Sequence, residues 1–76
     1  MEIIDKVIKQ FDLEVKFHSS HTNSSRWENH KINLLHNGYG RFTVEQKTIN
    51  KPQFTIDYDD VNFEGYLISV IKLLQT

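Results

Sequence analysis

The sequence predicts an α+β fold with the element order helix, four strands, helix (αββββα), in which a four-stranded antiparallel meander carries both helices on one face. Two observations predict this class. Apolar residues recur at helical spacing near both ends of the chain, and they alternate with polar residues in the segments between. The length of 76 residues suits one small domain, residues 1–76. We expect helix packing to stabilise it, because so short a chain forms only a small core.

The first helix is predicted over residues 2–11. Ile4, Val7, Ile8 and Phe11 recur at the spacing that gathers apolar side chains on one helix face. Acidic residues in the first turn, followed by lysines, complement the helix dipole. This segment is therefore an amphipathic helix with one face available for the core.

The first strand follows over residues 13–17. Leu13, Val15 and Phe17 alternate with charged residues, which predicts a strand with these three side chains on one face. Positions 18 to 25 then carry no apolar side chain. We expect residues 18–26 to form an exposed, flexible loop, because such a segment cannot contribute to a core.

A β-hairpin is predicted over residues 30–48. A two-residue turn at Asn37-Gly38 would put Leu34 on the opposite face from Phe42 and Val44, so that no single core could use them all. Two longer loops, which pair Leu34 with Phe42 or with Val44, keep these side chains on one face.

We favour the pairing of Leu34 with Val44 because of the turn that it requires. It gives a type I turn that begins at Asn37, with Gly40 in the left-handed conformation that closes a bulge. The other register would put Tyr39 in that conformation, at a cost of about 1–2 kcal/mol for a residue with a Cβ atom.

A second turn is predicted at residues 48–52, before a strand over residues 54–58. Pairing position 48 with position 52 sets Val44 opposite Ile56. The apolar face of the sheet then stays consistent across three strands.

The last helix presents a wide apolar surface. Its main stripe has spacings of four, three and four residues, and a second set of apolar side chains extends beyond it. Two alternatives for covering this surface stay open, namely the first helix or a second copy of the protein. We favour the first helix and expect Ile68 to be the most exposed position. If a second copy covers the surface instead, a possible homodimer through the C-terminal helix would use Ile68 and Leu73 as its interface. The stripe consists of Phe63, Leu67, Val70 and Leu74, and the second set of Tyr66, Ile68, Ile71 and Leu73.

The composition of the chain argues against several classes of function. There is no cysteine, hence no disulfide and no thiolate metal site, as in proteins of reducing compartments. No apolar run is long enough to span a bilayer, and no secretion signal is evident, so we expect a cytoplasmic protein without membrane association. A net charge of −1 provides no general attraction to nucleic acid.

No motif in the chain indicates catalysis. The four histidines have no recognisable metal-ligand spacing, and the serines beside His18 and His21 have no positioned base or oxyanion site. We therefore expect a protein that is not an enzyme and that uses no metal and no cofactor.

The predicted binding surface lies on the sheet face that the helices leave uncovered and in the adjoining loop. Its candidate residues are Arg26, Trp27, Leu35, Tyr39 and Arg41, because Trp, Tyr and Arg are frequent interface anchors. For Trp27 the alternative is that the ring folds inward and covers the core.

The resulting hypothesis is a small, non-catalytic intracellular module that binds a protein partner not yet identified. Many Ile, Asn and Lys residues are typical of low-GC bacteria and their phages, which suggests a phage- or prophage-type accessory or inhibitory protein. The alternative is a nucleic-acid-binding protein that uses Arg26, Trp27, Lys31, Arg41 and Lys47. We consider nucleic acid the less favoured partner.

Overall fold

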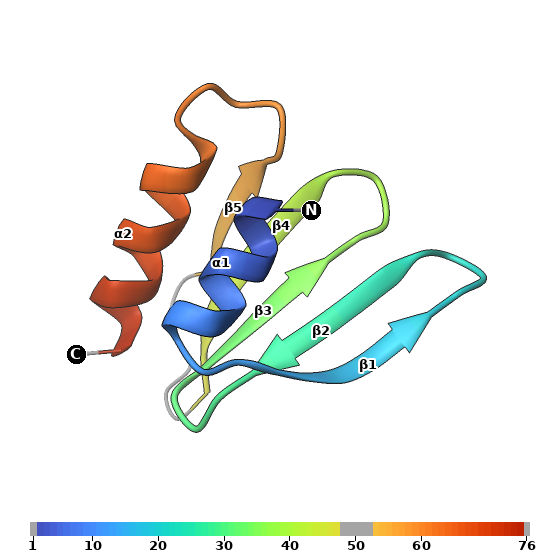
Figure 1. Cartoon of the computed structure of the whole chain (residues 1–76), viewed down its shortest axis with the longest axis horizontal. Helices are drawn as coiled ribbons and strands as arrows, with labels where there is room; N and C mark the ends of the chain where they lie inside the picture. Colours follow the sequence, from blue (N-terminus) through green and yellow to red (C-terminus); the bar gives the residue numbers. More distant parts are fainter. Residues whose placement is uncertain (1, 48–52, 76) are drawn as a thin grey trace.

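The computed structural model describes residues 2–47 and 53–75. Within these residues, five antiparallel strands form one sheet in the order β1-β2-β3-β4-β5, and the two helices cover one of its faces (Figure 1). The predicted α+β class is confirmed, but the number of strands is five instead of four. The elements are α1 (Glu2–Gln10), β1 (Glu14–Ser19), β2 (Ser24–Glu28), β3 (Ile32–His36), β4 (Arg41–Gln46), β5 (Phe54–Asp57) and α2 (Phe63–Gln75).

The additional strand, β2, lies in the segment where we expected a loop. Residues 18–26 form the end of β1, a turn and the start of β2. The turn contains Asn23 at a φ of 58°, a left-handed conformation that Asn tolerates better than most residues. The β1–β2 hairpin extends past both helices, so its polar sequence is compatible with strand structure (Figure 1). The lack of apolar side chains in residues 18–25 excludes the segment from the core, but it does not exclude the segment from the sheet.

A β-bulge in β1 corrects a second expectation. Val15 pairs with Trp27 and Phe17 pairs with Arg26, so the register shifts at Lys16. The extra residue moves Phe17 to the face opposite Val15. Leu13, Val15 and Phe17 therefore do not share one face, as their alternation had predicted.

Helix α1 ends in a Schellman motif. The Leu13 N–H donates to the carbonyl oxygen of Ile8 over 3.0 Å, and Asp12 between them has a φ of 55°. This left-handed residue turns the chain out of the helix and into β1.

The predicted register of the β3–β4 hairpin is confirmed. Leu34 pairs with Val44, and His36 pairs with Phe42. Gly40 has the expected positive φ of 90°.

The predicted turn type is wrong, because Gly38 also has a φ of 90° and a type I turn requires a negative φ there. A Cβ atom on Gly38 would lie 2.2 Å from the carbonyl oxygen of Thr22. The close approach of the β1–β2 turn thus explains a glycine at this position. The side chain of Asn37 completes the turn by accepting hydrogen bonds from the N–H groups of Tyr39 (2.7 Å) and Arg41 (3.1 Å).

The register between β4 and β5 differs by two residues from the prediction. Val44 pairs with Phe54, and Ile56 pairs with Phe42 instead of Val44. A shift of two residues preserves the alternation of faces, so Ile56 still points into the core. The turn predicted at residues 48–52 lies outside the described residues.

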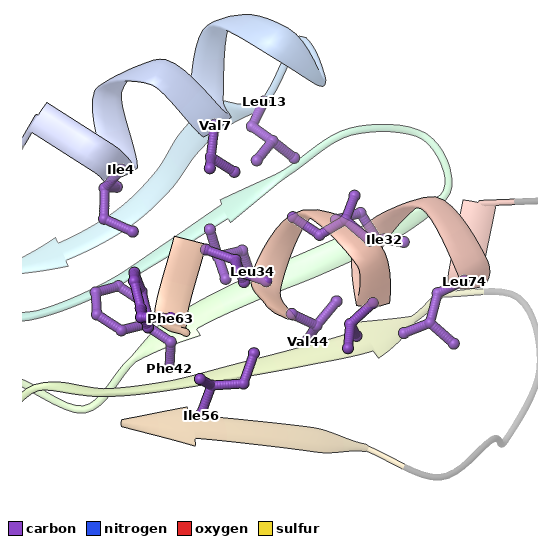
Figure 2. Packing of buried hydrophobic residues seen from close by; sticks show 13 residues of the cluster. Ile4, Val7, Leu13, Ile32, Leu34, Phe42, Val44, Ile56, Phe63 and Leu74 are labelled. Carbon is purple, nitrogen blue, oxygen red and sulfur yellow. The ribbon is translucent and has the colours of Figure 1, made fainter. Parts of the chain in front are cut away.

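The core lies between the helices and the sheet (Figure 2). An aromatic cluster joins α2 to the sheet, since the Phe63 ring lies 5.2 Å from Phe42 and 5.0 Å from Tyr58 between ring centroids. Such aromatic pairs contribute roughly 0.5–1.5 kcal/mol beyond their buried area. The buried apolar side chains are Ile4, Val7, Leu13, Ile32, Leu34, Phe42, Val44, Ile56, Phe63, Leu67, Val70, Ile71 and Leu74.

Helix α1 lies beside α2 and covers one of its flanks. Lys6 forms an ion pair with Glu64, and Ile68, one turn further along α2, is partly buried and packs against the core. The expectation that Ile68 would be the most exposed apolar position is therefore wrong, whereas Leu73 is 62% exposed. Neither described helix is long and apolar enough to cross a membrane.

Candidate functional site

The face of the sheet opposite the helices is the candidate site, and we call it the outer face. Its central row crosses all five strands through directly paired residues. Phe17 and Leu35 provide apolar surface in this row, with Arg26 between them. Phe17 is 52% exposed, which is unusual for a phenylalanine in a sheet. The row consists of Phe17, Arg26, Leu35, Thr43 and Thr55.

A shallow hollow of about 490 Å³ lies over this row. Two apolar side chains, those of Phe17 and Leu35, line it together with polar and charged residues. The lining residues are Lys16, Phe17, Ser24, Ser25, Arg26, Leu35, His36, Asn37, Thr43, Glu45 and Gln53.

Charged side chains line the hollow on both sides. Lys16 and Arg26 line it on the β1–β2 side, and Glu45 lines it on the β4 side. The carboxylate of Glu45 accepts hydrogen bonds from the amides of Gln53 (2.6 Å) and Asn33 (3.0 Å). These contacts fix the orientation of Glu45, which lies across the hollow from the Phe17, Arg26 and Leu35 side chains.

Glu28 organises the charges at one end of the outer face. Its carboxylate lies 2.8 Å from Lys47 Nζ and 3.5 Å from Arg26 Nε. The hydrogen bond from Lys47, assisted by the positive charges of Lys47, Arg26 and Lys16, lowers the pKa of Glu28. Glu28 therefore stays ionised beside Arg26 and Lys47.

The structure brings together two of the five predicted binding residues. Arg26 and Leu35 are direct cross-strand partners in the hollow. Arg41 lies on the same face at the start of β4, where its Nε atom is 3.0 Å from Asp57. Tyr39 is 87% exposed in the β3–β4 turn. Trp27 lies on the opposite face, where it pairs with buried Leu34 and packs against the core, so it is separated from the other four.

Sequence reasoning missed Lys16 and Phe17 as members of this surface. Strict alternation put Phe17 on the face of Leu13, and only the bulge at Lys16 reverses it. The sequence around Lys16 contains no glycine that would have indicated a bulge.

Polar groups on the helix-covered face form a second row, His18, Ser25 and His36. His18 Nδ1 lies 2.7 Å from the Ser25 hydroxyl group, and His36 Nε2 accepts a hydrogen bond from the Gly40 N–H over 3.1 Å. Burial lowers the pKa of His36, because desolvation penalises the charged ring.

This row offers little scope for nucleophilic catalysis or for metal binding. A serine beside a histidine can act as a nucleophile only if substrate reaches it, and Ser25 is only 8% exposed. Among the residues that the structure describes, no three His, Cys, Asp or Glu side chains are close enough to bind one metal ion. Comparison of the chain with known protein families, with curated proteins and with solved structures finds no match.

Proposed function

We propose that this protein is a small, non-catalytic intracellular module that binds another protein through the outer face of its sheet. The observation that carries the proposal is the hollow over Phe17, Arg26 and Leu35, in which two apolar side chains flank an arginine and Glu45 lies on the β4 side. An accessory or inhibitory role of the phage or prophage type agrees with a module of this size.

The composition of the hollow supports a protein partner. Exposed aromatic side chains and arginine are enriched at the centres of protein interfaces, where they contribute more binding energy than other residues. Arg26 lies between Phe17 and Leu35 in the central row, where an arginine can contact both a carboxylate and apolar groups of a partner. The carboxylate of Glu45 on the β4 side of the hollow would orient the partner.

The contacts of the basic residues count against the nucleic-acid alternative. A phosphate would have to compete with an acidic partner for each of Arg26, Arg41 and Lys47. The Nζ atom of Lys31 donates to the carbonyl oxygen of Gln75. Trp27, the expected stacking platform, packs against the core instead of lying beside these cations.

Affinity capture with the variants Phe17→Glu and Arg26→Glu tests the proposal. Both side chains are largely exposed, so we expect both variants to fold and to lose the captured partner, with at least a tenfold loss of affinity, or about 1.4 kcal/mol. Tyr39→Glu is the matched control, because Tyr39 is 87% exposed and does not line the hollow.

Two results would contradict the proposal. One is a partner that both outer-face variants bind as well as the wild type. The other is binding of oligonucleotides that weakens steeply with salt concentration, which would favour the nucleic-acid alternative.

A further inference from the structure

The side of the molecule formed by β5 and α2 combines two features that lie outside the hollow of the outer face. The first is the edge of the sheet, because among the described strands β5 pairs only with β4. The Tyr58 N–H donates to the Gly40 carbonyl oxygen, so alternate residues of β5 direct their backbone groups towards β4. The N–H and C=O groups of Thr55 and Asp57 consequently point away from the sheet.

The second feature is the flank of α2 that α1 does not cover. Tyr66 is 48% exposed and Leu73 is 62% exposed, and Ser69 lies between them. Spacings of three and four residues place these side chains on one line along the helix. No charged residue belongs to this line, whereas Glu64 and Lys72 lie elsewhere on α2.

The spacing and the absence of charge indicate which kind of partner fits. An exposed seam at spacings of three and four is the pattern that helices use to pack against helices. A small residue at its centre, Ser69, allows close approach. A second copy of this chain supplies such a helix and brings no like charges together along the seam.

Ser69 at the middle of the helix seam and Thr55 on the strand edge also lie at about the same height along the direction of β5. Phe63 at the start of α2 lies beside Tyr58, with ring centroids 5.0 Å apart. From there, Ser69 is six residues along the helix, about 9 Å. Thr55 is three residues back along the strand, about 10 Å. One twofold axis can therefore pass close to both Ser69 and Thr55.

We propose that two copies of this chain form a homodimer about that axis. Strand β5 pairs antiparallel with β5 of the second copy near Thr55, which makes one continuous sheet. Helix α2 packs antiparallel against α2 of the second copy, with Ser69 at the crossing and Tyr66 of each copy near Leu73 of the other. Each surface is its own complement, as a twofold interface requires.

Helix α2 contacts β3, β4 and β5, and in Figure 1 it runs alongside β5 at the edge of the sheet. A second copy that pairs its β5 with this edge therefore brings its own α2 to the same interface.

The charges along the edge of β5 are also compatible with pairing to β5 of a second copy. Antiparallel pairing near Thr55 places Asp57 opposite the neutral Gln53 of the second copy. Arg41 already neutralises Asp57 within each chain. The acidic turn at Asp59 and Asp60 follows β5, so the two copies carry these turns at opposite ends of the interface.

A cysteine at the crossing provides a direct test, because the natural chain contains none. We expect Ser69→Cys to form an intermolecular disulfide rapidly under mild oxidation, since the two residues meet at the twofold axis. Ser20→Cys in the exposed β1–β2 turn is the control for random collision, and we expect it to crosslink at least tenfold more slowly. Equal crosslinking of the two variants would overturn the proposal.

Solution mass provides the second test. We expect the wild type to reach twice the 9.0 kDa of one chain as concentration rises. Leu73→Glu and Thr55→Pro should both remain monomeric, because one charges the seam and the other removes an N–H that points away from β4. Val15→Glu is the control, with a side chain that is 59% exposed on β1, at the opposite edge of the sheet. A monomeric wild type at every concentration would overturn the proposal, as would a dimer that survives both variants.

Discussion

At the scale of single residues, His36 links the β3–β4 turn to the pH of the solution. Its ring stacks on Phe42, with centroids 4.4 Å apart, and its Nε2 atom accepts the Gly40 N–H. Protonation would replace this acceptor by a donor that faces another donor. The imidazole must therefore be neutral for the turn to keep its hydrogen bond.

The pKa of His36 predicts how stability changes with pH. Because burial lowers this pKa in the folded chain, the unfolded chain takes up the proton first as the pH falls. The contribution of His36 to the free energy of unfolding is complete above about pH 6.5, the ordinary pKa of histidine, and is lost as the pH falls towards the lowered value. Urea unfolding at about pH 7.5 and about pH 5 measures this loss.

The variant His36→Gln isolates the effect, since an amide oxygen can still accept the Gly40 N–H but does not titrate here. We expect a smaller loss of stability on acidification in this variant than in the wild type. The other three histidines are present in both chains, so their effects cancel in the difference. An equal loss in the two chains would contradict a role for His36.

The glycines of the same turn show what a local pattern can predict. The positive φ of Gly40 follows from the hairpin register, which alternation within β3 and β4 already indicated. The positive φ of Gly38 accompanies a contact with Thr22. That contact exists only because residues 24–28 form a strand, so sequence reasoning that treated the segment as a loop could not predict it.

At the scale of elements, the end of α1 carries a conformational cost that one substitution can remove. Asp12 is the left-handed residue of the Schellman motif, a position that glycine usually occupies. A left-handed conformation costs a residue with a Cβ atom roughly 1–2 kcal/mol, and a negative charge at a helix C-terminus is also unfavourable. The greater freedom of glycine in the unfolded chain offsets part of this gain.

We therefore expect Asp12→Gly to raise the free energy of unfolding by about 1 kcal/mol, measured by chemical denaturation. Gln10→Gly is the matched control within α1, where glycine should cost about 1 kcal/mol instead. Destabilisation by both substitutions would show that the conformation of Asp12 is not strained.

The two ends of the sheet differ in how well their elements could be predicted. Strands β3, β4 and β5 face the helices, and their alternating apolar residues indicate both the strands and the face that is buried. In β2 the inward residues are Ser25 and Trp27, which form too short a pattern to indicate a strand. The bulge in β1 then reverses the alternation, and this moves Phe17 into the candidate site.

At the scale of the whole molecule, the core is not centred on the sheet. The buried cluster joins both helices to β3, β4 and β5, whereas Val15 and Phe17 of β1 are 59% and 52% exposed. Strand β1 is an edge strand held chiefly by its pairing with β2. Opening of β1 therefore exposes little additional apolar surface, and its local stability is low.

Amide hydrogen exchange measures this difference directly. We expect the amides of β1 that bond to β2 to exchange through local opening, well below the free energy of global unfolding. Those of Leu34 and Val44 should exchange only with global unfolding. Leu34→Ala should cost roughly 2–5 kcal/mol and accelerate exchange throughout the core, while Val15→Ala should cost much less because that side chain is largely exposed. If β1 were protected as strongly as β3, the sheet would be one cooperative unit. Phe17 and Lys16 would then form a rigid margin of the binding hollow instead of one that can adjust to its partner.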